Sequence, residues 1–273
     1  MQRTFYQEWN EQRMEAPIVL KRRIRPEYVI VSLLLLIPMG VAIICFLPRY
    51  ATFSAPGDIP SVQELGVNGS VRFCYVQEGV VHNLYERWSV NKAYPEAEFV
   101  SADSSAMEEM EDMMEIGESL RDETLLHAIT TAEAAAEVAL DEEERSSRLE
   151  ELMELAGEYY GDSLGLMLAI GLFEESRNED FSDGGRYVIA GTGTMEADHL
   201  VGSVGAIREK LLTAEKFGAD YFFVPGDRDR FYYEGISNEE EALHWADELE
   251  LSLEVVPVDT LEEAVDFLQK LKE

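Results

Sequence analysis

The segment GDSLG, residues 161–165, places Ser163 between two glycines, directly before a helix predicted over residues 164–175. Backbone N–H groups at the start of a helix have no partner inside the helix, so donors that can stabilise an oxyanion surround a hydroxyl at this place. The same pattern is typical of an ordinary helix cap. A second candidate for chemistry, Lys210, falls in a helix predicted over residues 205–217.

The pattern G-x-S-x-G also occurs at the nucleophile of α/β-hydrolases, and that interpretation does not fit here. The hydrolase turn follows a strand and is completed by a later acid and then a histidine. The residues before Ser163 predict a helix, and neither His199 nor His244 has triad-like surroundings. The sequence therefore gives no support for a serine–histidine triad.

The chain between residues 161 and 271 resembles the proteolytic domain of Lon-type serine peptidases. It is most similar to the membrane-anchored, Lon-like bacterial proteins that lack an ATPase. The segment GDSLGLMLAIGLFEE (161–175) is similar to the family's nucleophile segment G-P-S-A-G-L-M. The segment RYVIAGTGTMEADHLVGSVGAIREKLLTAEKFGADYFFVP (186–225) resembles the family's I-A-G-T-G-T-I, V-G-x-I-G-G-I-x-x-K and F-x-x-P run.

This resemblance implies a role for five residues of the chain. Ser163 is expected to be the nucleophile and Lys210 its general base, while Thr192 is expected to hold the lysine amine. The backbone at Leu164 and Gly165, where the helix begins, is expected to support the oxyanion. Because a free lysine has a pKa near 10.4, a base that works near neutral pH needs its pKa lowered by roughly two to three units, and burial has to supply this change.

Four positions depart from the family pattern. Asp162 replaces a proline, Leu164 a small alanine, and Ala206 and His199 stand where glycines are usual. An ionised Asp162 would raise the pKa of the lysine and oppose catalysis, and Leu164 would narrow the place where the scissile carbonyl lies. Two alternatives therefore stay open: a catalytically inactive Lon-like scaffold or binding protein, and an anchored subunit of an assembly.

Other motifs that carry chemistry are missing from the sequence. The dipeptide Gly-Lys does not occur, so there is no phosphate-binding G-x-x-x-x-G-K-[ST] loop and proteolysis is expected to be independent of ATP. The four histidines show no metal-ligand spacing. We expect no metal and no other cofactor.

Residues 28–47 form an uncharged run, YVIVSLLLLIPMGVAIICFL, which predicts one transmembrane helix. A cleavable signal peptide is the competing interpretation, but its apolar region would be shorter and an A-x-A site is missing. The bases before the run outnumber those after it, so the basic tail, residues 1–27, is expected in the cytoplasm and the body outside. The bases that carry this prediction are Lys21, Arg22, Arg23 and Arg25.

The body is expected to have an α/β fold with two regions. Residues 48–160 form a leader with short strands and then acidic helices, and residues 161–273 form the Lon-like domain. The PDZ domain that usually separates these regions in the anchored relatives is missing. In the leader we expect a strand at 70–76, helices at 132–140 and 146–160 with a capping box at Ser147 and Glu150, a solvated connection at 141–144, and a buried methionine stripe at 107, 110, 113 and 114. In the second region we expect strands at 186–191, 220–225 and 251–256 and helices at 164–175, 205–217, 238–248 and 260–271.

The chain has 55 acidic and 22 basic residues and a formal net charge of -33. Such a surface repels phosphate, so nucleic acid is not an expected partner. Cys45 lies in the apolar run and Cys74 in the body, so no disulfide is available within the body. The partners expected are a peptide or protein substrate and the membrane, with a homo-oligomer as a further possibility.

Overall fold

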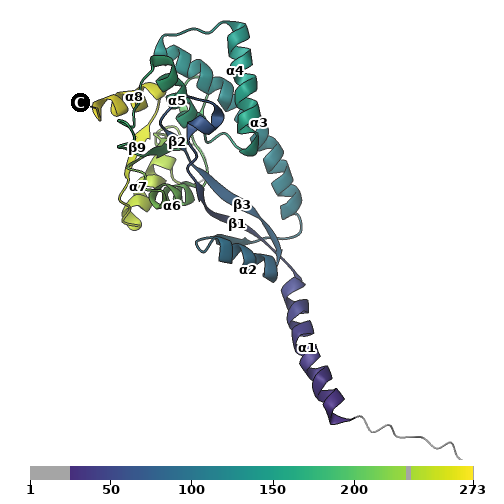
Figure 1. Ribbon diagram of the computed structural model, residues 1–273. Helices are drawn as coiled ribbons and strands as arrows, with labels where there is room; N and C mark the ends of the chain where they lie inside the picture. The colour runs from purple at the N-terminus through teal and green to yellow at the C-terminus, as the bar shows by residue number, and fades with distance from the viewer. Residues whose placement is uncertain (1–24, 232–234, 273) are drawn as a thin grey trace, which may run out of the picture. The chain divides into compact units, whose positions relative to one another are not determined.

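The structure is a computed structural model, which describes residues 25–231 and 235–272 (Figure 1). Its architecture is mixed α/β with one apolar helix near the N-terminus. The chain divides into two compact units, Met1–Leu47 and Pro48–Glu273. Most of the expected cytoplasmic tail, residues 1–24, lies outside the described residues.

The first unit contains helix α1 (Pro26–Phe46), where the sequence predicts a span at 28–47. Proline at the first helical position supports the helix start because its missing N–H would have no partner there. The helix has 21 residues, and by length and composition it can cross a membrane. None of its residues is buried, which distinguishes α1 from the core helix of a soluble domain.

The second unit contains the other elements, and Figure 1 labels its helices and the strands β1, β2, β3 and β9. The strands are β1 (Pro48–Asp58), β2 (Arg72–Phe73), β3 (Tyr75–Asn83), β4 (Glu98–Ser101), β5 (Ile189–Gly191), β6 (Thr194–Met195), β7 (Val201–Gly202), β8 (Tyr221–Pro225) and β9 (Glu254–Val258). The helices are α2 (Leu84–Ala93), α3 (Ala106–Ala136), α4 (Glu142–Leu155), α5 (Gly165–Arg177), α6 (Ile207–Lys216), α7 (Asn238–Glu248) and α8 (Leu261–Lys270), with 3-10 turns η1 (Val62–Leu65) and η2 (Ala156–Glu158).

A four-stranded parallel sheet, in the order β2-β5-β8-β9, lies at the centre of this unit. The sequence of strand β8 is apolar throughout because both faces of the parallel sheet are covered by helices. Alternate residues of a strand point to opposite faces, so side chains of β8 are buried on both faces. Phe223 belongs to the core cluster that includes residues of α5 and α8. Phe222 and Val224 belong to the cluster that includes residues of α6 and α7.

A three-stranded antiparallel sheet, in the order β3-β1-β4, accompanies the parallel one. The strand predicted at 70–76 is in fact divided between the two sheets. Strand β2 ends at Phe73 in the parallel sheet, and β3 begins at Tyr75 in the antiparallel sheet. Cys74 is the residue between them, and its side chain is buried.

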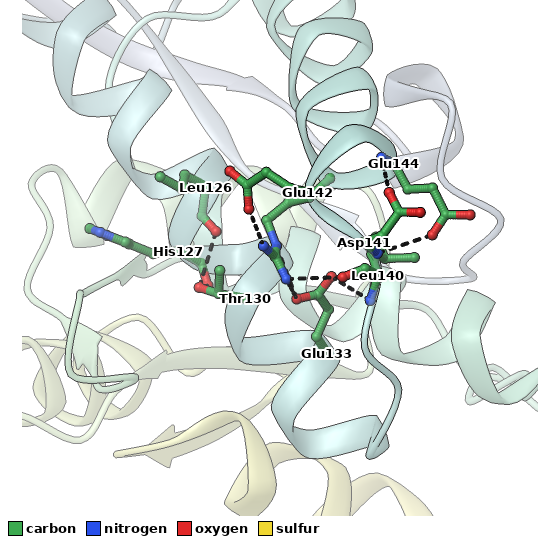
Figure 2. Close-up of polar contacts among 9 residues, drawn as sticks. Leu126, His127, Thr130, Glu133, Leu140, Asp141, Glu142 and Glu144 are labelled. Carbon is green, nitrogen blue, oxygen red and sulfur yellow. Dashed lines mark hydrogen bonds and ion pairs between the residues drawn. The ribbon is translucent and has the colours of Figure 1, made fainter.

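The two helices predicted in the acidic leader have wrong boundaries. Helix α3 runs without interruption from Ala106 to Ala136 and ends at Glu137, whose φ of 54° is left-handed. Helix α4 begins at Glu142, capped by Asp141, so the expected capping box at Ser147 is wrong. Residues 141–144 are exposed, as expected, but they form the start of a helix and not a connection. Figure 2 shows the junction, in which Asp141 accepts the backbone N–H of Glu144 at 2.9 Å.

Glu133, near the end of α3, explains why the chain turns here. Its carboxylate accepts a hydrogen bond from the backbone N–H of Leu140 at 3.2 Å (Figure 2). It also accepts one from Nη2 of Arg145 at 2.9 Å. The side chain of Glu133 therefore holds the end of α3, the connection and the start of α4 together.

The buried methionine stripe predicted on α3 is also wrong. Met107, Met113 and Met114 are exposed, and Ile116 on the same half of the helix is 60% exposed. Most buried residues of α3 lie further along the chain, from Gly117 onward. Leu125, Ala128 and Ile129 belong to the main core cluster.

The leader and the C-terminal half share one core. Glu174 of α5 is fully buried, and its carboxylate accepts the backbone N–H and the hydroxyl of Ser70 at 2.7 and 2.5 Å and the backbone N–H of Phe181 at 2.7 Å. Gly69 approaches so closely that a Cβ atom there would lie 2.7 Å from Cα of Gly171. Residues 68–70 are thus held against α5 by hydrogen bonds and by close backbone packing.

Replacing Glu174 with glutamine should destabilise the second unit. An amide offers one acceptor oxygen in place of two, so a buried donor of Ser70 or Phe181 loses its partner. We expect a loss of about 2 kcal/mol and a fall in Tm of roughly 4–8 °C for a unit of this size, measured by thermal unfolding in detergent. Glu179→Gln is the matched control, and an equal Tm for both variants would contradict this role for Glu174.

Candidate active site

A cavity of about 430 Å³ lies beside the turn that carries Ser163. One wall is the start of strand β3 and another is the segment before α5. The third wall is formed by the N-terminus of α6 and includes Lys210. The residues lining the cavity are Tyr75, Val76, Gln77, Glu78, Glu158, Tyr159, Tyr160, Gly161, Asp162, Ser163, Gly205, Ala206 and Lys210.

The turn before α5 holds Ser163 by its backbone. The carbonyl of Ser163 accepts the backbone N–H of Gly193 at 3.0 Å and the hydroxyl of Thr192 at 3.2 Å. In the other direction, the N–H of Leu166 donates to the carbonyl of Gly193 at 2.9 Å. The loop that follows β5 therefore positions the serine from both sides.

Lys210 is 4% exposed, although it is a lysine on a helix with a polar face. Its Nζ donates to Oγ1 of Thr192 at 3.0 Å. Burial lowers the pKa of this amine from its ordinary value, and nearby groups including Cys74, Asp162 and Glu78 oppose the shift. Among the described residues no carboxylate lies within 4.0 Å of Nζ, so the amine is desolvated without an ion pair.

Thr192 connects the two residues that the resemblance pairs. Its buried hydroxyl accepts a hydrogen bond from Lys210 and donates one to the carbonyl of Ser163. Within the described part of the chain, no hydrogen bond joins Oγ of Ser163 directly to Nζ of Lys210. Both residues line one cavity, and Thr192 links the amine of Lys210 to the backbone carbonyl of Ser163.

The backbone donors beside Ser163 differ from those expected. The N–H of Gly165 is already used, because it donates to the carbonyl of Asp162 at 3.0 Å. For the N–H groups of Ser163 and Leu164, the described residues provide no acceptor. These two groups, and not Gly165, are the donors available for an oxyanion.

Leu164 does not narrow the cavity. Its side chain is 3% exposed, belongs to the main core cluster and is not part of the cavity wall. The expected effect on a scissile carbonyl is therefore wrong, because the side chain at this position points into the core.

Gly165 has a packing role that the sequence did not indicate. A Cβ atom at this position would contact Oγ1 of Thr124 and lie 2.7 Å from the backbone nitrogen of Met195. Thr124, on α3, accepts the N–H of Met195 at 2.8 Å and shares a hydrogen bond with the hydroxyl of Thr194 at 3.0 Å. Helix α3 of the leader thus packs against the start of α5 through Thr124.

Asp162 lines the cavity and is not paired with the lysine. Burial raises the pKa of its carboxyl, while the charge of Lys210 and a hydrogen bond from Thr194 act in the opposite direction. Among the described residues the carboxylate makes no ion pair within 4.0 Å. Its negative charge still opposes the neutral form of the amine.

The leader supplies part of the cavity wall, which sequence reasoning missed. Tyr160 donates its hydroxyl to the carboxylate of Glu78 at 2.9 Å, joining the segment before Ser163 to β3. The spacing between these two residues carried no signal, since the contact joins segments 82 residues apart.

A comparison with known protein families gives no matching family, and a comparison with curated proteins gives no match either. The candidate site is therefore described by its own geometry.

Lys210→Met should reveal the charge state of the buried amine. A lysine whose pKa is lowered in the fold binds fewer protons than the unfolded chain, so the stability of the unsubstituted protein should rise with pH until the ordinary lysine pKa near 10.4. The slope for one proton is at most about 1.4 kcal/mol per pH unit. The advantage in Tm of Lys210→Met should shrink with increasing pH, measured in detergent from about pH 6 to about pH 10. Parallel curves for the two proteins would mean that the folded protein keeps the amine charged.

Proposed function

We propose that this protein is a membrane-anchored serine endopeptidase that works without ATP and uses Ser163 and Lys210 as a dyad. The observation that carries the proposal is the buried, carboxylate-free amine of Lys210 in the wall of the cavity that also contains Ser163. A lysine can act as a base only when it is neutral, and desolvation favours that form. The substrates proposed are peptides or unfolded protein segments near the extracytoplasmic surface of the membrane.

In the proposed reaction, the hydroxyl of Ser163 approaches the neutral amine of Lys210 within the cavity that both residues line. Nζ of Lys210 accepts the hydroxyl proton while Oγ forms a bond to the scissile carbonyl carbon. The N–H groups of Ser163 and Leu164 stabilise the resulting oxyanion. The ammonium then protonates the leaving amine as the C–N bond breaks. In the second half, Nζ of Lys210 accepts a proton from water while the water oxygen forms a bond to the acyl carbon. The ammonium returns this proton to Oγ of Ser163 as the C–Oγ bond breaks and the acid product leaves.

Strand β3 offers a means of holding an extended peptide. In the described part of the chain β3 is an edge strand that pairs only with β1. Its residues 75–78 form a wall of the cavity. An edge strand has unpaired backbone groups that an extended peptide can join, so a bound segment can present its carbonyl to Ser163.

The backbone conformation at two positions supports the proposed relation to Lon-type peptidases, independently of sequence similarity. Ala206 and His199, which stand where that family has glycines, have φ values of 58° and 66°. Residues other than glycine seldom adopt this left-handed conformation. The backbone at these two places therefore has the shape that favours the family's glycines.

The anchoring and orientation belong to the same proposal. Helix α1 is long and apolar enough to cross a membrane. The cluster of bases just before it favours a cytoplasmic N-terminus and an extracytoplasmic body. A homo-oligomer is compatible with this arrangement.

The second candidate function is a catalytically inactive Lon-like scaffold that binds a partner. It is favoured by the lack of a direct Ser163–Lys210 hydrogen bond within the described residues and by the negative charge of Asp162. Catalytic hydrogen bonds are often long before substrate binds, which is why the peptidase is the leading proposal. Activity measurements separate the two.

Ser163→Ala and Lys210→Met should each abolish hydrolysis of fluorescently labelled casein by the full chain in detergent. Loss of either member of such a pair typically reduces kcat by about 10³-fold or more. Lys216→Met is the matched control, because this lysine lies exposed in the last turn of the same helix. The scaffold is favoured instead if the unsubstituted chain has no activity, and the dyad is excluded if turnover survives both substitutions.

Asp162→Asn should shift the pH profile of the peptidase. Activity requires the neutral amine, so kcat/KM should increase with pH through the pKa of Lys210 in the free enzyme. Because the charge of Asp162 raises that pKa, its removal should move the rising limb to lower pH. Asp198→Asn, on an exposed loop, is the control, and an unchanged limb in Asp162→Asn would show that residue 162 does not influence the base.

A further inference from the structure

Helix α2 packs loosely on the body and exposes aromatic side chains. None of its ten residues is buried. Trp88 is 59% exposed and Tyr85 is 49% exposed. Large aromatic side chains at this level of exposure, next to one another, are unusual on a surface that otherwise carries mainly acids.

Three of the exposed residues form one row along the helix. Tyr85, Trp88 and Lys92 are spaced by three and four residues, so they share a face. The ring centroids of Tyr85 and Trp88 are 6.1 Å apart, and Nζ of Lys92 lies 5.6 Å from the centroid of the Trp88 ring. This row, Tyr85-Trp88-Lys92, combines two amphipathic rings with a cation.

Another contact fixes the helix to the body. The guanidinium of Arg87 lies 4.5 Å from the ring centroid of Phe99 in β4. Glu86 is turned to its own cap, where it accepts hydrogen bonds from His82 and Asn83. The row therefore has a defined orientation on the second unit.

The start of α2 lies beside the residue at which the chain leaves α1. Helix α1 ends at Phe46, and Pro48 begins β1. In the antiparallel pairing of β1 with β3, Pro48 stands opposite Asn83, which is the N-cap of α2. Directly opposed residues of such a pair have Cα atoms about 4.5–5.5 Å apart, so α2 begins within one strand spacing of Pro48.

The charge of this corner differs from that of the whole chain. The formal net charge is -33, yet Arg49, Arg87 and Lys92 gather around the start of β1 and along α2. In the described part of the chain, these three bases have no carboxylate within 4.0 Å. The exposed side chains of Arg49 and Lys92 are available to an anionic surface, whereas the guanidinium of Arg87 lies over the ring of Phe99.

We propose that α2 is an interfacial helix whose Tyr85-Trp88-Lys92 row lies in the headgroup region of an anionic phospholipid leaflet. Tryptophan, tyrosine and lysine are the residues that anchor proteins at this depth, and each base near an anionic surface adds attraction. The proposal rests on α1 crossing the membrane, as in the proposed function.

Fixing α2 at the surface also fixes the candidate site. Strand β3 runs directly into α2, and the cavity residue Glu78 precedes Asn83 by five positions. At about 3.3 Å per residue these positions are roughly 17 Å apart. The cavity is then held at a short, constant distance from the lipid, which selects segments that leave the membrane nearby.

Quenching of tryptophan fluorescence by brominated lipid tests this proposal without measuring activity. The full chain with Trp9→Phe and Trp245→Phe, reconstituted in phosphatidylcholine–phosphatidylglycerol vesicles, keeps Trp88 as its one tryptophan. We expect bromine on the acyl chains to reduce its emission by about half, since interfacial tryptophans lie close to the acyl chains. The control chain also carries Trp88→Phe and Tyr187→Trp. Tyr187 contacts Tyr221, which pairs with Glu254 of β9. Strand β9 lies away from α2 in Figure 1, so the emission of the control should not change.

Flotation of the vesicles on a density gradient separates the possible failures. A chain that floats with Trp88 quenched and the Tyr187→Trp control unquenched supports the interfacial helix. A floating chain in which Trp88 is not quenched overturns it while leaving the membrane anchor intact. A chain that does not float refutes the anchor, and with it this inference and the location in the proposed function, whereas the dyad is still decided by casein hydrolysis.

Discussion

The central constraint in this structure is the burial of the Lys210 amine. Charged lysines are rarely removed from water unless a carboxylate accompanies them, and the described residues offer Nζ the hydroxyl of Thr192 instead. That hydroxyl is fixed in turn, because it donates to the carbonyl of Ser163. Strand β5, the turn before α5 and helix α6 therefore meet at one hydrogen-bonded threonine. Movement of any of these elements would leave a buried polar group without its partner.

The leader is part of this arrangement. Strand β2 forms an edge of the parallel sheet, Thr124 supports the start of α5, and β3 forms a wall of the cavity. Glu174 fastens residues 68–70 to α5 from within the core. Residues 161–273 alone would lack a strand, a supporting helix and part of the cavity. The second unit is thus a single folding body, although its two halves differ in composition.

Sequence reasoning located the elements whose signal is local. The apolar run of β8 and the amphipathic pattern of α6 can be recognised from their own residues alone. The predicted boundaries of both elements agree with the structure to within one or two residues. The beginning of α4 was wrong because Asp141 and Ser147 are equally good caps by composition, and Glu133, on another helix, decides between them. Two other features depend on contacts between distant parts of the chain. One is the exposure of Met113, and the other is the position of Ser163 and Lys210 in the wall of one cavity. The pairing of Ser163 with Lys210 was predicted only through a resemblance, and Tyr160 with Glu78 was missed.

Two opposing influences act on the candidate base, and their balance depends on water. Asp162, Glu78 and Glu209 favour the ammonium form of Lys210, whereas burial alone favours the neutral amine. Enclosure, and not any neighbouring charge, is therefore the influence that lowers the pKa of the amine. In the proposed enzyme a peptide that pairs with β3 would cover the cavity and exclude water from it, which deepens the desolvation of the amine. Substrate binding and activation of the base would then be coupled in the proposed enzyme.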